Sequence, residues 1–492
     1  MSSQTKSVPM SHKLAFGAGM LANQMFPAAL SIFIVVLVED LGFSPVLLSI
    51  IAFAPRLFDS ITDPIMGFIS DNTKSRWGRR RQYVFVGALI IGISYVFMWQ
   101  LHPENSLMYN FTYFMIWSFI FYLGVTIFGV PYVAMGYEMS EDFHERTQIM
   151  AIAQFIGQWA WVIAPWFWVI FFDHGELFQS AVNNEYTWIS TLLPENGWFA
   201  SSDAAVRETS IWVAVVCTIL AMIPAFFIKS KSTLDDESLT PIKLNNIGKV
   251  FREVWASFKE AFAITQFRKL CIATFFIYNS FNTIAAFSFF IIVHYLFSGD
   301  AGAAGVWPAL HGCIGALMTT FLVIPIVASI SKRIGKKRTF LISQGVSIFG
   351  YILFWFLFVP GKPYLFLIAL PFFSFGIGAL FTLMMSMTAD VCDLDELNTG
   401  KRREGQFGAI YWWMVKFGFA IAGGLSGVIM ASVGFDPEAS VQVEGAMTGM
   451  RLFYTFFPIA GTLIAMYAMW NYDLTEERAA EVRAALAARK KA

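Results

Sequence analysis

Long apolar segments separated by short polar connections follow one another along the whole chain. Twelve of these segments are long enough to cross a hydrocarbon layer of about 30 Å, which takes roughly 20 helical residues. They are 14–38, 44–70, 82–102, 111–137, 147–172, 210–228, 268–297, 307–331, 339–358, 364–389, 405–432 and 449–470. The pattern therefore predicts an all-α polytopic membrane protein with twelve transmembrane helices.

Two connections are longer than the others. In 229–267, apolar and charged residues recur at helical spacing through IGKVFREVWASFKEAF, a pattern typical of an amphipathic helix on the inner membrane face. This linker divides the chain into an N-terminal six-helix half, 1–228, and a C-terminal six-helix half, 268–470, which is followed by a cytoplasmic tail, 471–492. The other long connection, 173–209, is expected outside the membrane, where we favour an ordered insertion over a folded cap.

Composition agrees with a membrane protein and excludes other classes. Hydrophobic residues make up 57% of the 492 residues and charged residues only 14%, which excludes a water-soluble globule of ordinary composition. Basic and acidic residues number 34 each, so nothing favours nucleic-acid binding. Most Lys and Arg residues fall in alternate connections, whereas the outside loops carry only Arg207 and Lys362, so both termini are expected in the cytoplasm. We expect a multi-pass protein of the plasma (inner) membrane.

Three charges lie inside the second apolar segment. Arg56, Asp59 and Asp63, in PRLFDSITDPIMGF, are spaced by three and four residues and so share one face of a helix. Charges inside a bilayer line polar, water-filled surfaces, which indicates an ion pathway. Two ionised carboxylates one turn apart repel each other, and either a hard cation or a proton relieves the repulsion. The alternative is a buried salt bridge between Arg56 and one Asp that only fixes helix packing, but it leaves the second carboxylate unexplained.

The two halves repeat each other in sequence. GFISDNTKSRWGRRRQYVF after the second segment has a counterpart in PIVASISKRIGKKRTFLI after the eighth, with Gly78 matching Gly335. Likewise, VPYVAMGYEMSEDFHERTQIM parallels MSMTADVCDLDELNTGKRREGQFGAI. Six-helix repeats of this kind are typical of transporters whose substrate site lies between the halves near the bilayer midplane.

Charged residues gather at the helix ends on the predicted cytoplasmic side. A surface ion pair is worth only about 0.2–1 kcal/mol, so a latch needs several pairs together. We therefore predict a cytoplasmic gate made of a charge network. Its residues are Asp71, Arg76, Arg79, Arg80, Arg81, Glu138, Arg146, Asp390, Arg403 and Glu404.

At this point the motifs resemble a known family. The loop motif G-x-x-x-D-(x)-R-x-G-R-R-R after the second segment resembles that of the major facilitator superfamily. RLFDSITDPIMG before it and ADVCDLDELNTGKRREGQF after the tenth segment are similar to the glycoside-pentoside-hexuronide:cation symporters, the melibiose-permease-like family. The resemblance covers nearly the whole chain. It implies the major facilitator fold, alternating access, and uptake driven by a sodium or proton gradient.

The resemblance also implies a cation site. The family's site falls on Asp59 and Asp63, where sodium is possible, with Thr62 between them and Thr126 on the fourth helix as a hydroxyl ligand. Lys416, in IYWWMVKFG of the eleventh helix, matches the family's intramembrane lysine. Arg56 and Lys416 formally balance the two carboxylates, so both are expected to serve coupling and charge balance.

The substrate site departs from the family pattern. Where melibiose permease has acidic residues, a tryptophan and an arginine, this chain has Gln24, Gly129, Val133 and Gln154, so a galactoside site is not expected. Amides pair with hydroxyls and aromatic faces cover sugar rings, which suits a neutral carbohydrate or, through Lys416, a sugar acid. Each amide also suits helix–helix contacts, and each Trp suits packing or the membrane interface. The substrate-binding candidates are Asn23, Gln24, Gln154, Gln158, Trp161, Asn279, Asn282, Tyr411 and Trp412.

The sequence therefore predicts a secondary active transporter for cation-coupled symport of a sugar, glycoside or sugar acid. An amphipathic, lipid-like substrate is the alternative, and a channel or a membrane enzyme is less favoured because the halves repeat and the six histidines are scattered without a catalytic motif. We expect no enzymatic activity and no cofactor besides the coupling sodium ion or proton. The expected partners are a small carbohydrate and the lipid bilayer, with no nucleic acid, and the protein is expected to be a monomer.

Overall fold

The computed structural model describes residues 8–140, 143–172, 199, 201–228, 232–234, 247–400, 404–436, 439 and 442–489. The chain divides into two compact units, Met1–Phe251 and Arg252–Ala492. Each unit contains six helical stretches that are long and apolar enough to cross a membrane, twelve in all. The predicted all-α fold with twelve transmembrane helices is thereby confirmed.

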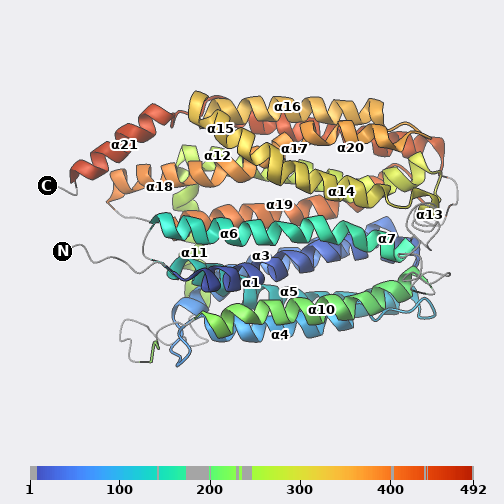
Figure 1. The fold of residues 1–492 in the computed structure, drawn as a ribbon, viewed down its shortest axis with the longest axis horizontal. Coiled ribbons are helices and arrows are strands. Elements are labelled where there is room, and N and C mark those ends of the chain that lie inside the picture. Colours follow the sequence, from blue (N-terminus) through green and yellow to red (C-terminus); the bar gives the residue numbers. More distant parts are fainter. Residues whose placement is uncertain are drawn as a thin grey trace. The chain divides into compact units, whose positions relative to one another are not determined.

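The first unit is built from helices that run side by side (Figure 1). Helix α1 packs against α6 and α10, α4 packs against α5 and α10, and α3 packs against α5. A Cβ atom on Gly87 of α4 would lie 2.5 Å from the backbone nitrogen of Phe128 in α5, so only glycine allows these two helices to approach so closely. The elements are α1 (Met10–Phe33), α2 (Val35–Glu39), α3 (Pro45–Asp71), α4 (Arg81–Met98), α5 (Leu107–Glu138), α6 (Phe143–Ile163), η1 (Ala164–Trp166), α7 (Phe167–Phe172) and α10 (Ser202–Phe227).

Serine side chains cap three of these helices. Ser44, Ser106 and Ser201 each precede a helix and accept a hydrogen bond from the backbone N–H three residues on, which satisfies one of the free donors at the helix start. The cap at Ser201 begins α10 well before residue 210, where the sixth apolar segment was expected to start. The extra turns carry Asp203 and Arg207, an i,i+4 ion pair. Of the predicted outside connection 173–209, residues 173–198 and 200 lie outside the described residues.

The second unit repeats the bundle but interrupts three of its spans with π-helical turns. These are η3, η4 and η6, and each follows or divides an α-helix within one span. A π turn adds a residue to the local turn and often marks a functional segment. The elements are α12 (Thr265–Phe290), η3 (Ile291–Leu296), α13 (Ala301–Ala304), α14 (Trp307–Leu317), η4 (Met318–Val323), α15 (Ile324–Ile334), α16 (Lys336–Leu357), η5 (Pro363–Ile368), α17 (Leu370–Ala379), η6 (Leu380–Met384), α18 (Met385–Thr399), α19 (Glu404–Ser432), α20 (Glu444–Trp470) and α21 (Glu476–Arg489).

Two helices lie outside the twelve spans. Helix α11 (Ile247–Ala263) occupies the second part of the predicted linker, and the boundary between the two units falls within it. Helix α21 lies in the segment that the sequence suggested only as a tail, and it packs against α18 (Figure 1). Its buried residues Ala479, Val482 and Leu486 are spaced by three and four, so one helical face joins the core of the second unit.

Candidate cation-binding and substrate-binding sites

Helix α3 carries the intramembrane charges that the sequence singled out. Pro55 and Pro64 lie inside this helix, and each removes a backbone N–H that would otherwise bond within it. Between them, the Ser60 hydroxyl donates to the Arg56 carbonyl at 3.0 Å. Asp59 is almost completely buried, with 4% of its surface exposed, and Asp63 lies half-buried one turn further along the same face.

A chain of hydroxyl groups leads from α3 to α5 and back to Asp59. The Thr126 hydroxyl donates to Asp59 Oδ1 at 2.7 Å, and Thr62 Oγ1 lies 2.9 Å from Thr126 Oγ1. A hydroxyl has one proton, so when Thr126 donates to the carboxylate, Thr62 must be the donor in the second bond. Thr126 is 1% exposed. The structure thus brings one carboxylate and two hydroxyl oxygens together in a buried junction between two helices.

Arg56 makes a second polar contact between α3 and α5. Its Nε donates to the Tyr122 hydroxyl at 3.0 Å. Tyr122 lies one turn before Thr126 on α5, and Arg56 lies nearly one turn before Asp59 on α3, so the two contacts follow each other along the same helix pair. Sequence reasoning missed Tyr122 because a tyrosine in an aromatic-rich span does not stand out.

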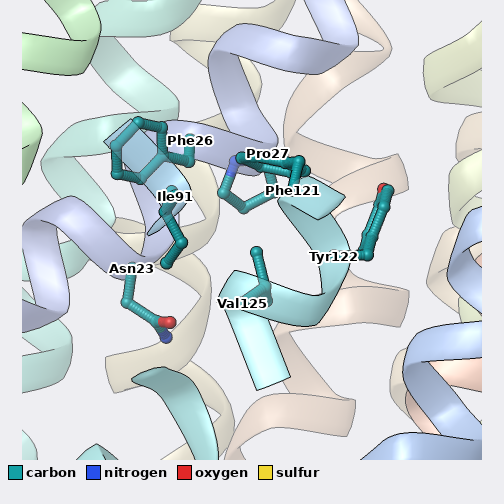
Figure 2. A pocket seen from close by; sticks show the side chains of 7 residues that line it. All are labelled: Asn23, Phe26, Pro27, Ile91, Phe121, Tyr122 and Val125. Atoms are coloured by element: carbon teal, nitrogen blue, oxygen red, sulfur yellow. The ribbon is translucent and has the colours of Figure 1, made fainter. Parts of the chain in front are cut away.

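A small cavity is lined by residues of α1, α4 and α5 (Figure 2). Its volume is about 40 Å³, which holds a water molecule but is far below the ~300 Å³ or more of a typical ligand pocket. The polar side chains that line it are Asn23 of α1 and Tyr122 of α5, which lie on opposite sides of the view in Figure 2. The lining residues are Asn23, Phe26, Pro27, Ile91, Phe121, Tyr122 and Val125.

Three of the predicted substrate residues meet between α1 and α6. The indole Nε1 of Trp161 donates to Gln24 Oε1 at 2.7 Å, and Gln24 Nε2 donates to Gln154 Oε1 at 3.0 Å. Gln154 and Trp161 come from α6, where Gln158 lies half-buried between them. We call Trp161, Gln24 and Gln154 the amide relay.

The candidates of the second unit are used differently. Asn279 is buried and its Nδ2 lies 3.5 Å from the Gly418 carbonyl, which joins α12 to α19. Asn282 donates to the Tyr278 carbonyl of its own helix at 2.7 Å. On α19, Tyr411 is buried in the core, whereas Trp412 is 38% exposed. Lys416, on the same helix, is half-buried.

Several predicted gate residues pair at one end of the first unit. Arg80 lies 2.7 Å from Asp71 and 3.2 Å from Glu138, and Glu138 also pairs with Arg79. Burial lowers the pKa of the Arg80 guanidinium, and the carboxylates of Glu138 and Asp71 oppose that shift. Arg81 instead donates to the Ala225 carbonyl at 2.7 Å. The ion pairs of Arg79 and Arg80 with Glu138 thus join the loop after α3 to the end of α5.

The second unit has a related pair. Lys336 Nζ lies 2.6 Å from Asp390 Oδ2, and Arg483 of α21 lies 4.0 Å from Asp390 Oδ1. Sequence reasoning missed Lys336, although it follows Gly335 as Arg79 follows Gly78 in the repeated loop motif. Of the remaining predicted gate residues, Arg76 is exposed. Arg403 and the side chains of Arg146 and Glu404 lie outside the described residues.

One charged cluster was not anticipated. Lys13 of α1 is only 6% exposed, and its Nζ donates to Gln148 Oε1 of α6 at 2.7 Å and lies 3.4 Å from Glu145 Oε1. Glu145 also accepts hydrogen bonds from the Val8 backbone and the Ser140 hydroxyl, and the Val8 bond is the largest cause that lowers the pKa of Glu145. These bonds pin the start of α1 to the start of α6.

Two six-helix units with charged side chains inside their spans are typical of secondary transporters. The family model described as MFS/sugar transport protein matches residues 15–476. The chain belongs to this family, and within the major facilitator superfamily to the glycoside-pentoside-hexuronide:cation symporters. The predicted resemblance is confirmed, and the protein is a multi-pass membrane transporter rather than an enzyme.

Individual relatives are distant but nearly full-length. The chain is 24% identical to a glucuronide carrier protein homolog of Escherichia coli, covering 89% of this chain and 86% of the relative. It is 26% identical to a lactose permease of Leuconostoc lactis, covering 98% of this chain and 72% of the relative. A bacterial homolog of the human lysosomal transporter Spinster has a similar fold, with a TM-score of 0.63 and 13% identity over 95% of this chain and 98% of that chain.

Proposed function

We propose that this protein carries a sugar, a glycoside or a sugar acid across the membrane together with a sodium ion. The relatives support the substrate class, because one is named for a glucuronide and another for lactose. Membership of a symporter family supports coupling to a cation. The two parts of the proposal then rest on different helices, the cation on α3 and α5 and the substrate on α1 and α6.

The observation that carries the cation site is the hydrogen-bonded chain from Thr62 through Thr126 to Asp59. Hard cations bind oxygen ligands, and this junction offers the oxygens of one carboxylate and two hydroxyls. Asp63 supplies a second carboxylate one turn away. A proton would need only the carboxylates, so the two hydroxyls favour sodium as the coupling ion.

The same helix pair offers a route from the cation to the substrate. A sodium ion at Asp59 changes the contacts of α3 with α5. Because Arg56 of α3 donates a hydrogen bond to Tyr122 of α5, a movement of α3 also displaces the Tyr122 side chain. Tyr122 lines the small cavity together with Asn23 of α1. The next residue of α1 is Gln24, the centre of the amide relay. Only two helix contacts, that of α3 with α5 and that of α5 with α1, thus separate the cation site from the substrate residues.

We assign the gate to the charged helix ends. Arg80, Asp71 and Glu138 form a network in the first unit, and Lys336 with Asp390 forms a pair in the second. Each set of pairs lies within one unit, so it stiffens the end of its own bundle. A stiff end favours movement of each unit as a rigid body, which alternating access requires.

The test of the cation site uses purified protein in lipid vesicles with a sodium gradient or a pH gradient imposed separately. Asp59→Asn should abolish sodium-driven accumulation of a labelled sugar, because the amide lacks the negative charge that attracts the ion. Asp203→Asn is the matched control, since Asp203 also lies in a transmembrane helix but pairs with Arg207 at the start of α10. Sodium-driven accumulation that survives in the Asp59→Asn variant would refute the assignment of Asp59 to the cation site. If the wild-type protein accumulates the sugar with a pH gradient and not with a sodium gradient, the coupling ion is the proton.

A further inference from the structure

The direction of every bond in the amide relay is fixed by Trp161. An amide can turn over and exchange its donor and acceptor ends, but an indole N–H can only donate. Because Trp161 Nε1 lies 2.7 Å from the Gln24 side chain, Gln24 must offer it the carbonyl oxygen. The Gln24 amide nitrogen then faces Gln154 and donates a hydrogen bond, so Gln154 must accept it through its own side-chain oxygen. One indole therefore sets the orientation of two amides.

Packing holds the middle amide in this place. A Cβ atom on Gly157 would lie 2.8 Å from Gln24 Nε2 and 2.7 Å from Met20 Cγ, so glycine provides the space in which the Gln24 side chain lies against α6. Gln24 itself is half-buried between the two helices. It cannot leave the relay without losing both hydrogen bonds, which makes the relay a preorganised unit.

The outer end of the relay offers hydrogen-bond donors. Gln154 is exposed, its oxygen is taken by Gln24, and within the described part of the chain its amide nitrogen has no hydrogen-bond acceptor. The apolar exposed residues Phe155 and Trp159 follow on a neighbouring face of α6, as expected for a lipid-facing side. A polar group that approaches Gln154 thus meets two N–H bonds.

We propose that the amide relay makes Gln154 a selective contact for the carboxylate of a sugar acid. A carboxylate only accepts hydrogen bonds, and its negative charge strengthens each bond that it accepts from the Gln154 N–H groups. A sugar hydroxyl accepts as a neutral group and must find a different partner for its own proton, because the relay offers no acceptor. The inference rests on the proposed function and narrows its substrate class to uronic acids and their glycosides. Gln154 contacts the substrate, and Trp161 is a positioning residue that acts through Gln24.

The charges of the spans favour the same substrate. Arg56 and Lys416 equal Asp59 and Asp63 in number, so this set is neutral before a cation binds. A bound sodium ion leaves one uncompensated positive charge, and uncompensated charge inside the membrane is costly. A carboxylate that enters with the sodium restores neutrality, whereas a neutral sugar does not.

The test compares two probes that differ only at carbon 6, methyl β-D-glucuronide with a carboxylate and methyl β-D-glucoside with a hydroxymethyl group. Binding to the purified protein in sodium is measured by calorimetry, and uptake is measured in vesicles. The wild-type protein should prefer the glucuronide. Gln24→Glu places a carboxylate that accepts from both Trp161 and Gln154, which turns the Gln154 amide over so that its oxygen faces outward. The preference should then fall on the order of tenfold or reverse.

Two further variants separate orientation from charge. Trp161→Phe keeps an aromatic ring for packing but removes the N–H, so it frees both amides to turn without any change in charge, and the preference should fall in part. Gln100→Glu adds the same charge as Gln24→Glu at the end of α4, away from the relay, and should leave the preference unchanged. Melting temperatures measured in parallel show that each variant is folded.

The outcomes distinguish the inference from the proposed function. A wild-type protein that accumulates the glucoside or another neutral sugar with sodium but ignores the glucuronide would overturn the inference and leave the proposed function standing. An unchanged preference in both Gln24→Glu and Trp161→Phe would overturn the role of the relay. A protein that binds no carbohydrate of a panel of neutral sugars and uronates would refute both.

Discussion

Replacing Thr126 by Val tests the cation site through a single oxygen atom. Valine has nearly the shape of threonine, so the packing between α3 and α5 is kept while the hydroxyl that donates to Asp59 is removed. Thr62 then loses its partner on α5, but its hydroxyl already lies 3.1 Å from the Asp59 carbonyl and 3.2 Å from the Phe58 carbonyl, where it can donate instead. The net loss is one hydrogen bond to a buried carboxylate.

That loss sets the expected magnitudes. A hydrogen bond to a charged group contributes about 1.5–3 kcal/mol, so Thr126→Val should lower the free energy of unfolding by that amount without sodium. In the wild-type protein the Thr126 hydroxyl can keep its hydrogen bond to Asp59 when sodium binds. The sodium ion then occupies the lone pair of the Thr126 oxygen that accepts from Thr62 in the absence of the ion. The variant therefore loses an ion ligand only in the bound state, and its affinity for sodium should fall about tenfold, which corresponds to roughly 1.4 kcal/mol.

The assay is thermal unfolding of the purified protein over a series of sodium concentrations, which gives both the stability without sodium and the apparent sodium affinity. Thr126→Ser is the matched control, because serine keeps the hydroxyl and loses only a methyl group. Thr126→Ser should retain most of the sodium affinity. A Thr126→Val protein with unchanged sodium affinity would show that the hydroxyl is no ligand, and unchanged stability as well would refute the hydrogen bond itself.

Two further predictions address coupling and the gate. Lys416→Met should impair the sodium dependence of uptake for every transported compound if Lys416 serves charge balance, whereas a change in substrate affinity alone, with sodium dependence intact, would make it a substrate ligand. Asp71→Asn should loosen the end of the first unit, because Asp71 pairs with Arg80 within that unit, and this is seen as greater reactivity of cysteines introduced there toward reagents added on the cytoplasmic side. Glu138→Gln should loosen it further, because Glu138 pairs with Arg79 and Arg80, whereas Asp71 pairs with Arg80 alone within the described part of the chain. Equal cysteine reactivity in the wild-type protein and both variants would leave these charges with a role in topology only.

The sequence alone determined the membrane fold of this protein. Twelve helices can be read from hydropathy because every backbone group in lipid must bond within its own segment, so an apolar run of sufficient length has no alternative to a helix. The shared face of Arg56, Asp59 and Asp63 follows equally from the helical period, which is a local property. The sequence missed α21, whose apolar face consists of only Ala479, Val482 and Leu486 and becomes recognisable once it packs on α18.

The tertiary structure decided which polar groups meet. Thr126 lies 67 positions from Asp59 and Gln24 lies 130 positions from Gln154, and no periodicity within one helix specifies such contacts. They depend on where helices approach closely, which here is set by small residues such as Gly157. The amide residues could be selected as candidates from their type, but their donor and acceptor directions could not. Those directions follow from the Trp161 indole through the contact between α1 and α6, because the direction of a hydrogen bond depends on both partners, whereas the sequence gives each partner separately.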